Sequence, residues 1–197
     1  MENPHPTDLV LALQAKKDPC QFVALYQRHY RRVYVYHLAR TGNAQDAQDL
    51  TSETFMAALD SLPAYRPEAK NGREHSFAAW LFGIAHHKLA DFFDKWVPQS
   101  SLEEVGEHPT GDTPLASAEY APEQAAVQRS DLTRLRQLLA LLPEERADAL
   151  SLRYFSELSL AEVAQVMGKS EAAVKMLVYR GLQELRDRFG PAAVEEL

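Results

Sequence analysis

The sequence predicts an all-α protein with two small helical domains joined by a flexible acidic linker. Three observations support this prediction. Apolar residues recur at helical spacing along most of the chain, and glycine is scarce, at 8 of 197 residues. No segment shows the apolar/polar alternation of a strand. Residues 97–128 contain four prolines and six acidic side chains but no Lys or Arg, which is typical of a linker. We expect domains over 1–96 and 125–190, a linker over 97–124 and a short tail over 191–197.

Three long helices are expected in the first domain. The range 18–40 places apolar and aromatic residues at helical spacing, and "TGN" at 41–43 interrupts that pattern. A second helix follows over 44–62, and a loop containing two prolines and a glycine covers 63–76. The range 77–96 predicts a third helix with a strong apolar side.

The second domain begins with two predicted amphipathic helices, over 124–142 and 143–158. The stretch "SLAEVAQVMGKSEAAVKMLVYRGLQEL" at 159–185 then predicts helix, tight turn and helix. Ser159 and Glu162 form a capping-box pattern, Gly168 suits the end of the first helix, and Ser170 can cap the second.

If the second of these helices enters the major groove of DNA, its outward face supplies the contacts. Lys175 and Arg180 are the expected partners of phosphate or guanine. The ordinary alternative is a helical hairpin with a few exposed polar residues. The predicted DNA-facing set is Ser170, Glu171, Ala172, Lys175, Met176, Tyr179 and Arg180.

Composition limits the function classes. No apolar run approaches the roughly 20 residues of a membrane span, and the N-terminus lacks the pattern of a secretory signal. Cys20 stands alone, so it can form no intrachain disulfide, and a cytoplasmic location is expected. We expect Cys20 to be a small, at least half-buried filler. The formal net charge of −7 predicts weak DNA binding without a partner, because phosphate neutralisation supplies most non-specific affinity.

Three motifs in order resemble the bacterial RNA polymerase sigma factors of the extracytoplasmic-function (ECF) type. "DAQDLTSETFMAAL" is similar to the family's D-A-E-D-L-x-Q-E-x-F-x-x-x-W, and "FAAWLFGIAHHKLADFF" to its F-x-x-W-L-x-x-I-A-x-N-x-x-x-D. The stretch beginning "LPEERADALSLRYFSELSLAEVAQVMGKS" is similar to the family's second conserved domain. The resemblance implies two helical domains, regions 2 and 4, on a flexible linker. It also implies core RNA polymerase and promoter DNA as partners, an anti-sigma factor as a further partner, and neither cofactor nor small-molecule substrate.

The resemblance also assigns roles within the first domain. Asp46, Asp49 and Glu53 lie at i, i+3 and i+7, hence on one helix face, and in the family this face docks on polymerase. A solvated acidic face is the alternative. The loop before the third helix captures an unstacked promoter base in the family, and the third helix contacts the strand. The corresponding residues here are Tyr65, Arg66, Lys70, Asn71, Arg73, His86, His87 and Lys88.

Two departures from the family pattern reduce positive charge. His86-His87 stands where relatives have Arg-Asn, and Met176-Leu177 where many relatives have Ser-Arg. Both changes bear on promoter sequence and on the strength of DNA binding.

Two other classes of function compete with this reading. An enzyme would use His86, His87 and Asp91. His87 and Asp91 are four residues apart and could both face a metal, but no third or fourth ligand stands at a suitable spacing. A helix-turn-helix regulator that works without polymerase would explain the second domain and leave the first without a role.

Overall fold

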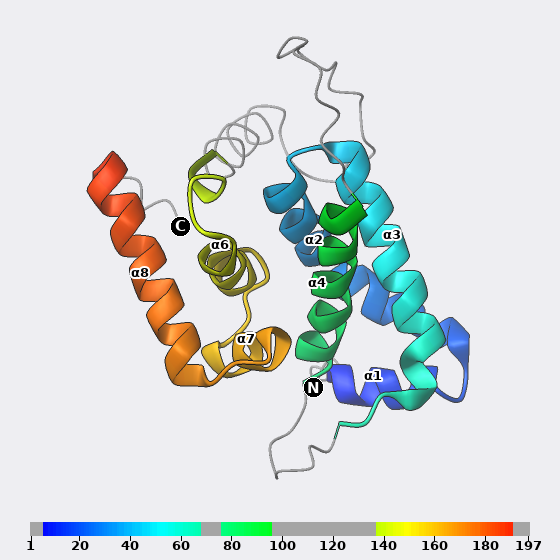
Figure 1. Cartoon of the computed structure of the whole chain (residues 1–197). Coiled ribbons are helices and arrows are strands. Elements are labelled where there is room, and N and C mark those ends of the chain that lie inside the picture. Colours follow the sequence, from blue (N-terminus) through cyan, green and yellow to red (C-terminus); the bar gives the residue numbers. More distant parts are fainter. Residues whose placement is uncertain (1–5, 68–75, 96–136, 191–197) are drawn as a thin grey trace, which may run out of the picture.

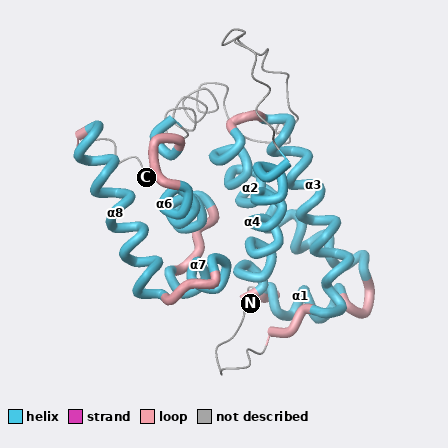
Figure 2. The backbone as a smooth tube through the Cα atoms, in the orientation of Figure 1, coloured by secondary structure: helices cyan, strands magenta, loops and turns pink. Residues whose placement is uncertain are grey.

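The structure is a computed structural model that describes residues 6–67, 76–95 and 137–190. These residues form helices and connecting turns, and no strand occurs among them (Figures 1 and 2). The all-α prediction is therefore confirmed. The expected linker and tail, and the expected helix over 124–142 apart from its last residues, lie outside the described ranges. No helix within those ranges is both long and apolar enough to cross a bilayer.

The first group of helices, here the N-lobe, contains the three long helices that the sequence predicts. Its elements are α1 (Asp8–Ala15), η1 (Pro19–Gln21), α2 (Phe22–Thr41), α3 (Ala44–Ser61), η2 (Leu62–Ala64) and α4 (Phe77–Lys95).

Helix α2 is the centre of the N-lobe and packs against α1, α3 and α4 (Figure 1). The predicted helical stripe is buried: Leu25, Val33 and Tyr36 have no exposed surface. Tyr26, which shares that stripe, is 40% exposed, because it stands at the edge of the lobe against Tyr30 and Phe55. The stripe thus forms the core, and its margin reaches solvent.

The "TGN" interruption between α2 and α3 has a clear local cause. Gly42 adopts a left-handed conformation with φ of 70°, which ends α2 and which residues with a Cβ adopt at a cost. Asn43 then caps α3, since its side-chain oxygen accepts hydrogen bonds from the backbone N–H groups of Gln45 and Asp46.

Helix α1 was not predicted. Thr7 accepts a hydrogen bond from the N–H of Val10 at its start, and Asp8 anchors it to α2. The Asp8 carboxylate contacts Arg28 Nη1 at 2.5 Å and His29 Nε2 at 2.7 Å. Burial alone would raise the pKa of Asp8, but these hydrogen bonds and charges outweigh it and lower that pKa. The expected burial of Cys20 is wrong, because η1 exposes the thiol.

The second group of helices, here the C-lobe, comprises α6 (Glu144–Leu150), η3 (Ser151–Phe155), α7 (Leu160–Met167) and α8 (Glu171–Phe189). The helix expected over 143–158 is shorter than predicted and is not uniform. After Leu150 it widens into a π-helical segment, η3, and the chain then turns at Glu157, whose φ is 52°. This turn allows Leu158 to return to the core, where it is fully buried.

The helix–turn–helix of α7 and α8 follows the predicted local rules. Ser159 and Glu162 form a complete capping box, with the Ser159 side chain bonded to the Glu162 N–H and the Glu162 carboxylate bonded to the Ser159 N–H at 2.8 Å. Gly168 ends α7 with φ of 62°, and Ser170 accepts from the N–H of Ala173. Sequence alone therefore determines both ends of the turn.

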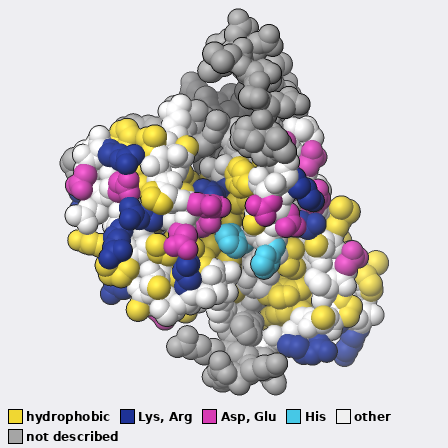
Figure 3. Space-filling model, viewed as in Figure 1, with side chains coloured by type: hydrophobic (Ala, Val, Ile, Leu, Met, Phe, Trp, Pro, Cys, Tyr) yellow, Lys and Arg dark blue, Asp and Glu magenta, His cyan; other side chains and the backbone are white. Residues whose placement is uncertain are grey.

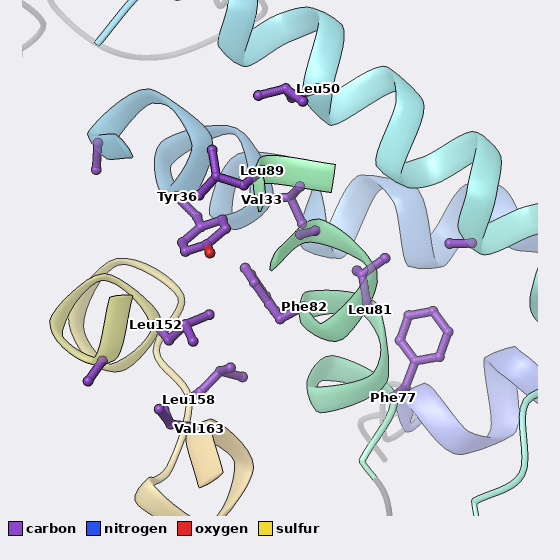
Figure 4. Packing of buried hydrophobic residues seen from close by; sticks show 14 of the residues in the cluster. Val33, Tyr36, Leu50, Phe77, Leu81, Phe82, Leu89, Leu152, Leu158 and Val163 are labelled. Atoms are coloured by element: carbon purple, nitrogen blue, oxygen red, sulfur yellow. The ribbon is translucent and has the colours of Figure 1, made fainter. Parts of the chain in front are cut away.

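The two lobes pack against each other, which the sequence did not predict. Helix α7 lies against α4, and η3 lies against α2. Figure 4 shows Tyr36 and Phe82 of the N-lobe facing Leu152, Leu158 and Val163 of the C-lobe. One continuous apolar cluster therefore runs through both lobes.

Candidate DNA and polymerase interfaces

Helix α8 separates an anchoring side from an outward side. Val174, Val178, Gly181 and Leu185 are buried against the rest of the C-lobe. Met176 is 45% exposed and Tyr179 is 59% exposed on the other side. The expected DNA-facing residues are all exposed, namely Ser170, Glu171, Ala172, Lys175, Met176, Tyr179 and Arg180. This exposure leaves the first turns of α8 accessible to a partner as large as a DNA duplex.

The outward side of α8 is held in place by close packing and by ion pairs. A Cβ at Gly181 would come within 2.9 Å of Leu150 Cδ1, so the absence of a side chain lets α8 approach α6 closely. Glu184 on α8 contacts Arg146 on α6 and Arg188 one turn later. Arg188 also donates to the Leu141 carbonyl at 3.2 Å. These contacts hold α8 against α6, and the outward side of its N-terminal half remains exposed to solvent.

On α3, the three predicted polymerase contacts lie on one outward face. Asp46 is half-buried, while Asp49 and Glu53 are exposed. Gln45 donates to Asp49 at 3.1 Å, and Lys88 Nζ lies 3.3 Å from a Glu53 carboxylate oxygen. These contacts are at the surface and hold the side chains only weakly, so the acidic face remains available to a basic partner.

The N-lobe residues expected to meet single-stranded DNA are more dispersed. The Tyr65 side chain is 2% exposed, and its ring packs against Phe77 and Trp80. Lys16 lies over that ring and donates to the Tyr65 carbonyl. A base could therefore stack on Tyr65 only after the loop moved. Arg66 is exposed and donates to the carbonyl oxygens of its own turn, while Lys70, Asn71 and Arg73 lie outside the described residues.

On α4, His86 and His87 have different environments. The Tyr36 hydroxyl lies 3.2 Å from His86 Nδ1. Burial raises the pKa of Tyr36, so the hydroxyl keeps its proton and donates to that nitrogen. Burial also lowers the pKa of His86, and the neighbouring Asp148 charge only partly opposes this effect. His86 is therefore a neutral group at the lobe contact, whereas His87 is exposed.

Sequence reasoning did not detect Arg40 and Asp148, the charged pair that spans the lobe contact. Arg40 Nη2 lies 2.9 Å from Asp148 Oδ1, and the side chains are 11% and 10% exposed. Both residues stand in ordinary helical stretches 108 positions apart, so no local spacing could have linked them. No three His, Cys, Asp or Glu side chains gather as metal ligands anywhere in the described ranges.

Two family models match the chain. The model "Sigma-70 region 2" matches residues 25–96, and the model "Sigma-70, region 4" matches residues 132–185. The two lobes correspond to these two regions, and the fold and matches together define a transcription initiation factor of the Sigma-70 class, which is not an enzyme.

Relatives with similar sequences identify the family within this class. "ECF RNA polymerase sigma factor SigD" of Mycobacterium tuberculosis (strain H37Rv) is 34% identical over 165 residues, which are 81% of this chain and 70% of SigD. "RNA polymerase sigma factor YlaC" of Bacillus subtilis is 30% identical over 173 residues, 87% of this chain and 94% of YlaC. The chain belongs to the ECF family of RNA polymerase sigma factors.

A solved structure supports the fold. CnrH, solved in complex with the cytosolic domain of CnrY, aligns with a TM-score of 0.64 over 91% of this chain and 95% of CnrH. The two sequences share 22% identity, so the likeness concerns the arrangement of helices.

Proposed function

We propose that this protein binds core RNA polymerase and directs it to selected promoters in the cytoplasm. In this proposal the C-lobe reads the upstream promoter element in the major groove, and the N-lobe melts the downstream element. The observation that carries the proposal is the outward face of α8, which is exposed over its first turns and held rigidly from behind by α6 and α7.

Charge on this face favours a supporting role for polymerase. Lys175 and Arg180 are opposed by Glu171 on the same exposed half of α8. Few phosphates are neutralised by such a face, so its affinity for DNA without a partner is low. An acidic face on α3 that docks on polymerase would supply the missing binding energy. This division of labour favours a sigma factor over a helix-turn-helix regulator that works without polymerase.

Regulation by an anti-sigma protein is part of the proposal. CnrH was solved with the cytosolic domain of CnrY. A comparable protein partner of this chain would have to cover α3 or α8 to prevent initiation.

Two double variants separate the functions of the lobes. Lys175→Glu with Arg180→Glu introduces charge repulsion against phosphate, and we expect loss of transcription from the cognate promoter with normal polymerase binding. Asp49→Arg with Glu53→Arg reverses the α3 face, and we expect loss of polymerase binding instead.

The measurements are run-off transcription with core polymerase on genomic DNA and co-elution of chain and polymerase on gel filtration. Lys169→Glu is the matched control, because Lys169 is a cation in the turn before α8 that pairs with Glu145 rather than facing outward. Full transcription by the α8 double variant would contradict the role of this helix. Normal co-elution of the α3 double variant would contradict polymerase docking.

A further inference from the structure

Two cations of the N-lobe bond to the same oxygen atom. Lys16, which ends α1, donates through Nζ to the Tyr65 carbonyl at 2.5 Å, and Arg66 donates through Nη1 to the same carbonyl at 3.1 Å. The two nitrogens are therefore held within about 6 Å of each other, because each donor lies at hydrogen-bond distance from one acceptor. The end of α1 and the turn after η2 thus place two positive charges side by side.

No carboxylate of the described residues compensates these two charges. The hydrogen-bond acceptors of Lys16 and Arg66 are the backbone carbonyl oxygens of Pro63 and Tyr65. Burial lowers the pKa of Lys16, and the neighbouring charge of Arg66 lowers it further. Two like charges held so closely repel each other, and an anion bound between them would remove that repulsion.

Both cations can meet an anion that arrives from solvent. Arg66 is exposed and Lys16 is half-buried. Each retains unused N–H groups, because an ammonium carries three donors and a guanidinium carries five. Figure 3 shows Lys and Arg side chains gathered at the lower edge of the N-lobe, below the position of α1 in Figure 1, while the acidic side chains visible on this face lie elsewhere on the lobe.

The two cations stand at the start of the loop over 63–76, which is expected to meet melted DNA. Lys16 Nζ lies 5.6 Å from the centroid of the Tyr65 ring, and this ring packs against Phe77 at the start of α4. Proteins bind unpaired strands by following the backbone with positive charges beside the sites that hold bases. Phosphate is the anion of that backbone, and it accepts hydrogen bonds from lysine and arginine together.

We propose that Lys16 and Arg66 form a binding site for one backbone phosphate of the unpaired promoter strand. This inference rests on the proposed function, because the N-lobe meets an unpaired strand only if it melts the downstream element. The match to Sigma-70 region 2 begins at residue 25, so Lys16 and the whole of α1 lie outside it. The site adds affinity whatever the neighbouring base is, since a phosphate contact carries no sequence information.

The first experiment needs no polymerase. The full chain is titrated with a short oligothymidylate, and binding is followed by fluorescence anisotropy. Lys16→Gln with Arg66→Gln removes both charges, while each amide can still donate to a carbonyl oxygen. We expect this double variant to bind about three- to tenfold more weakly than the parent, and the slope of log affinity against log salt to fall by about 0.7.

Two further variants of the full chain serve as controls in this titration. Lys16→Arg keeps the charge and should bind like the parent. Lys169→Gln with Arg188→Gln removes one Lys and one Arg that pair with carboxylates in the C-lobe, and it should leave the affinity unchanged. Equal affinity of the parent and the Lys16→Gln, Arg66→Gln variant would overturn the inference.

The complex with core polymerase locates the phosphate. The probe is the unpaired strand of a promoter found by run-off transcription, with single phosphates replaced in turn by uncharged methylphosphonate. We expect one linkage at which the replacement weakens binding by the parent complex about three- to tenfold and leaves binding by the Lys16→Gln, Arg66→Gln complex unchanged. The absence of such a linkage would also overturn the inference. A parent chain that does not associate with polymerase would refute the proposed function instead, while the oligothymidylate titration would still test the phosphate site.

Discussion

The two lobes place their buried polar groups differently. In the N-lobe these groups bond within the lobe: His37 Nε2 contacts Thr54 Oγ1 at 3.1 Å, and Thr54 donates to the Leu50 carbonyl. In the C-lobe, Asp148 and the Ser156 carbonyl find their partners on the N-lobe. The buried pair of His37 and Thr54 is thus bonded inside the N-lobe, whereas Asp148, the buried carboxylate of the C-lobe, meets its cation Arg40 across the lobe contact.

The helices differ in the same sense. α2, α3 and α4 are 20, 18 and 19 residues long and support one another along their lengths. In the C-lobe α6 and α7 have only 7 and 8 residues, and their ends depend on a π-helical segment, a capping box and a left-handed glycine. Short helices gain little from cooperativity along the chain. We therefore expect C-lobe stability to depend on backbone details and close packing, and N-lobe stability to depend on the core.

The largest effect is expected where α8 meets α6. Gly181→Val places a branched side chain within 2.9 Å of the fully buried Leu150, and overpacking of this kind costs up to about 3 kcal/mol. Hydrogen exchange measured by mass spectrometry should show faster exchange in α6 and α8 and unchanged exchange in α2 and α3.

Gly83→Val is the matched control in the N-lobe. A Cβ at Gly83 in α4 meets no atom within 4 Å, so the same substitution there should be neutral within about 0.5 kcal/mol. Equal destabilisation by the two variants would contradict the contrast between the lobes.

A pH-dependent effect of intermediate size is expected in the N-lobe. Thr54 uses its proton on Leu50, so His37 must donate through Nε2, and its Nδ1 is buried without a partner in the described structure. Burial lowers the pKa of His37 from 6.5 to about 3. Below pH 6.5 His37 therefore binds a proton in the unfolded chain but not in the folded chain. The free energy of unfolding falls as the pH drops through that value. Between pH 7 and pH 5 the loss is about 2 kcal/mol.

Urea unfolding at both pH values measures this loss, and His37→Gln is the comparison, because its amide can still donate to Thr54 and does not titrate. The variant should lack about 2 kcal/mol of the decrease that the parent shows. Any contribution from His86, whose pKa burial also lowers, remains in both chains and cancels. If parent and variant lose stability equally, protonation of His37 is not the cause.

Local signals in the sequence predicted most of the helices and little of how the lobes meet. The capping box at Ser159, the left-handed Gly168 and the buried stripe of α2 are all encoded within a few residues. Helix α1 was not predicted because the contact that anchors it, Asp8 with Arg28 and His29, is a tertiary contact. The burial of Tyr65 and the Arg40–Asp148 pair likewise depend on residues distant in the chain. The shared, exposed helix face of the expected polymerase contacts Asp49 and Glu53 was predictable from their spacing; contacts between helices were not.

The smallest expected effect tests the turn of the helix–turn–helix alone. A Cβ at Gly168 would meet no atom within 4 Å, so Gly168→Ala adds no clash, and only the left-handed backbone, with φ of 62°, opposes it. That conformation costs an L-residue roughly 1 kcal/mol. Thermal unfolding should show this loss, whereas Gly168→Asn should lose less, since Asn tolerates the left-handed region better than Ala. Because the cost lies in the backbone and not in packing, the exposed face of α8 should keep its orientation, and promoter binding at temperatures well below unfolding should match the parent. A loss of promoter binding without a loss of stability would instead show that the turn itself contacts DNA.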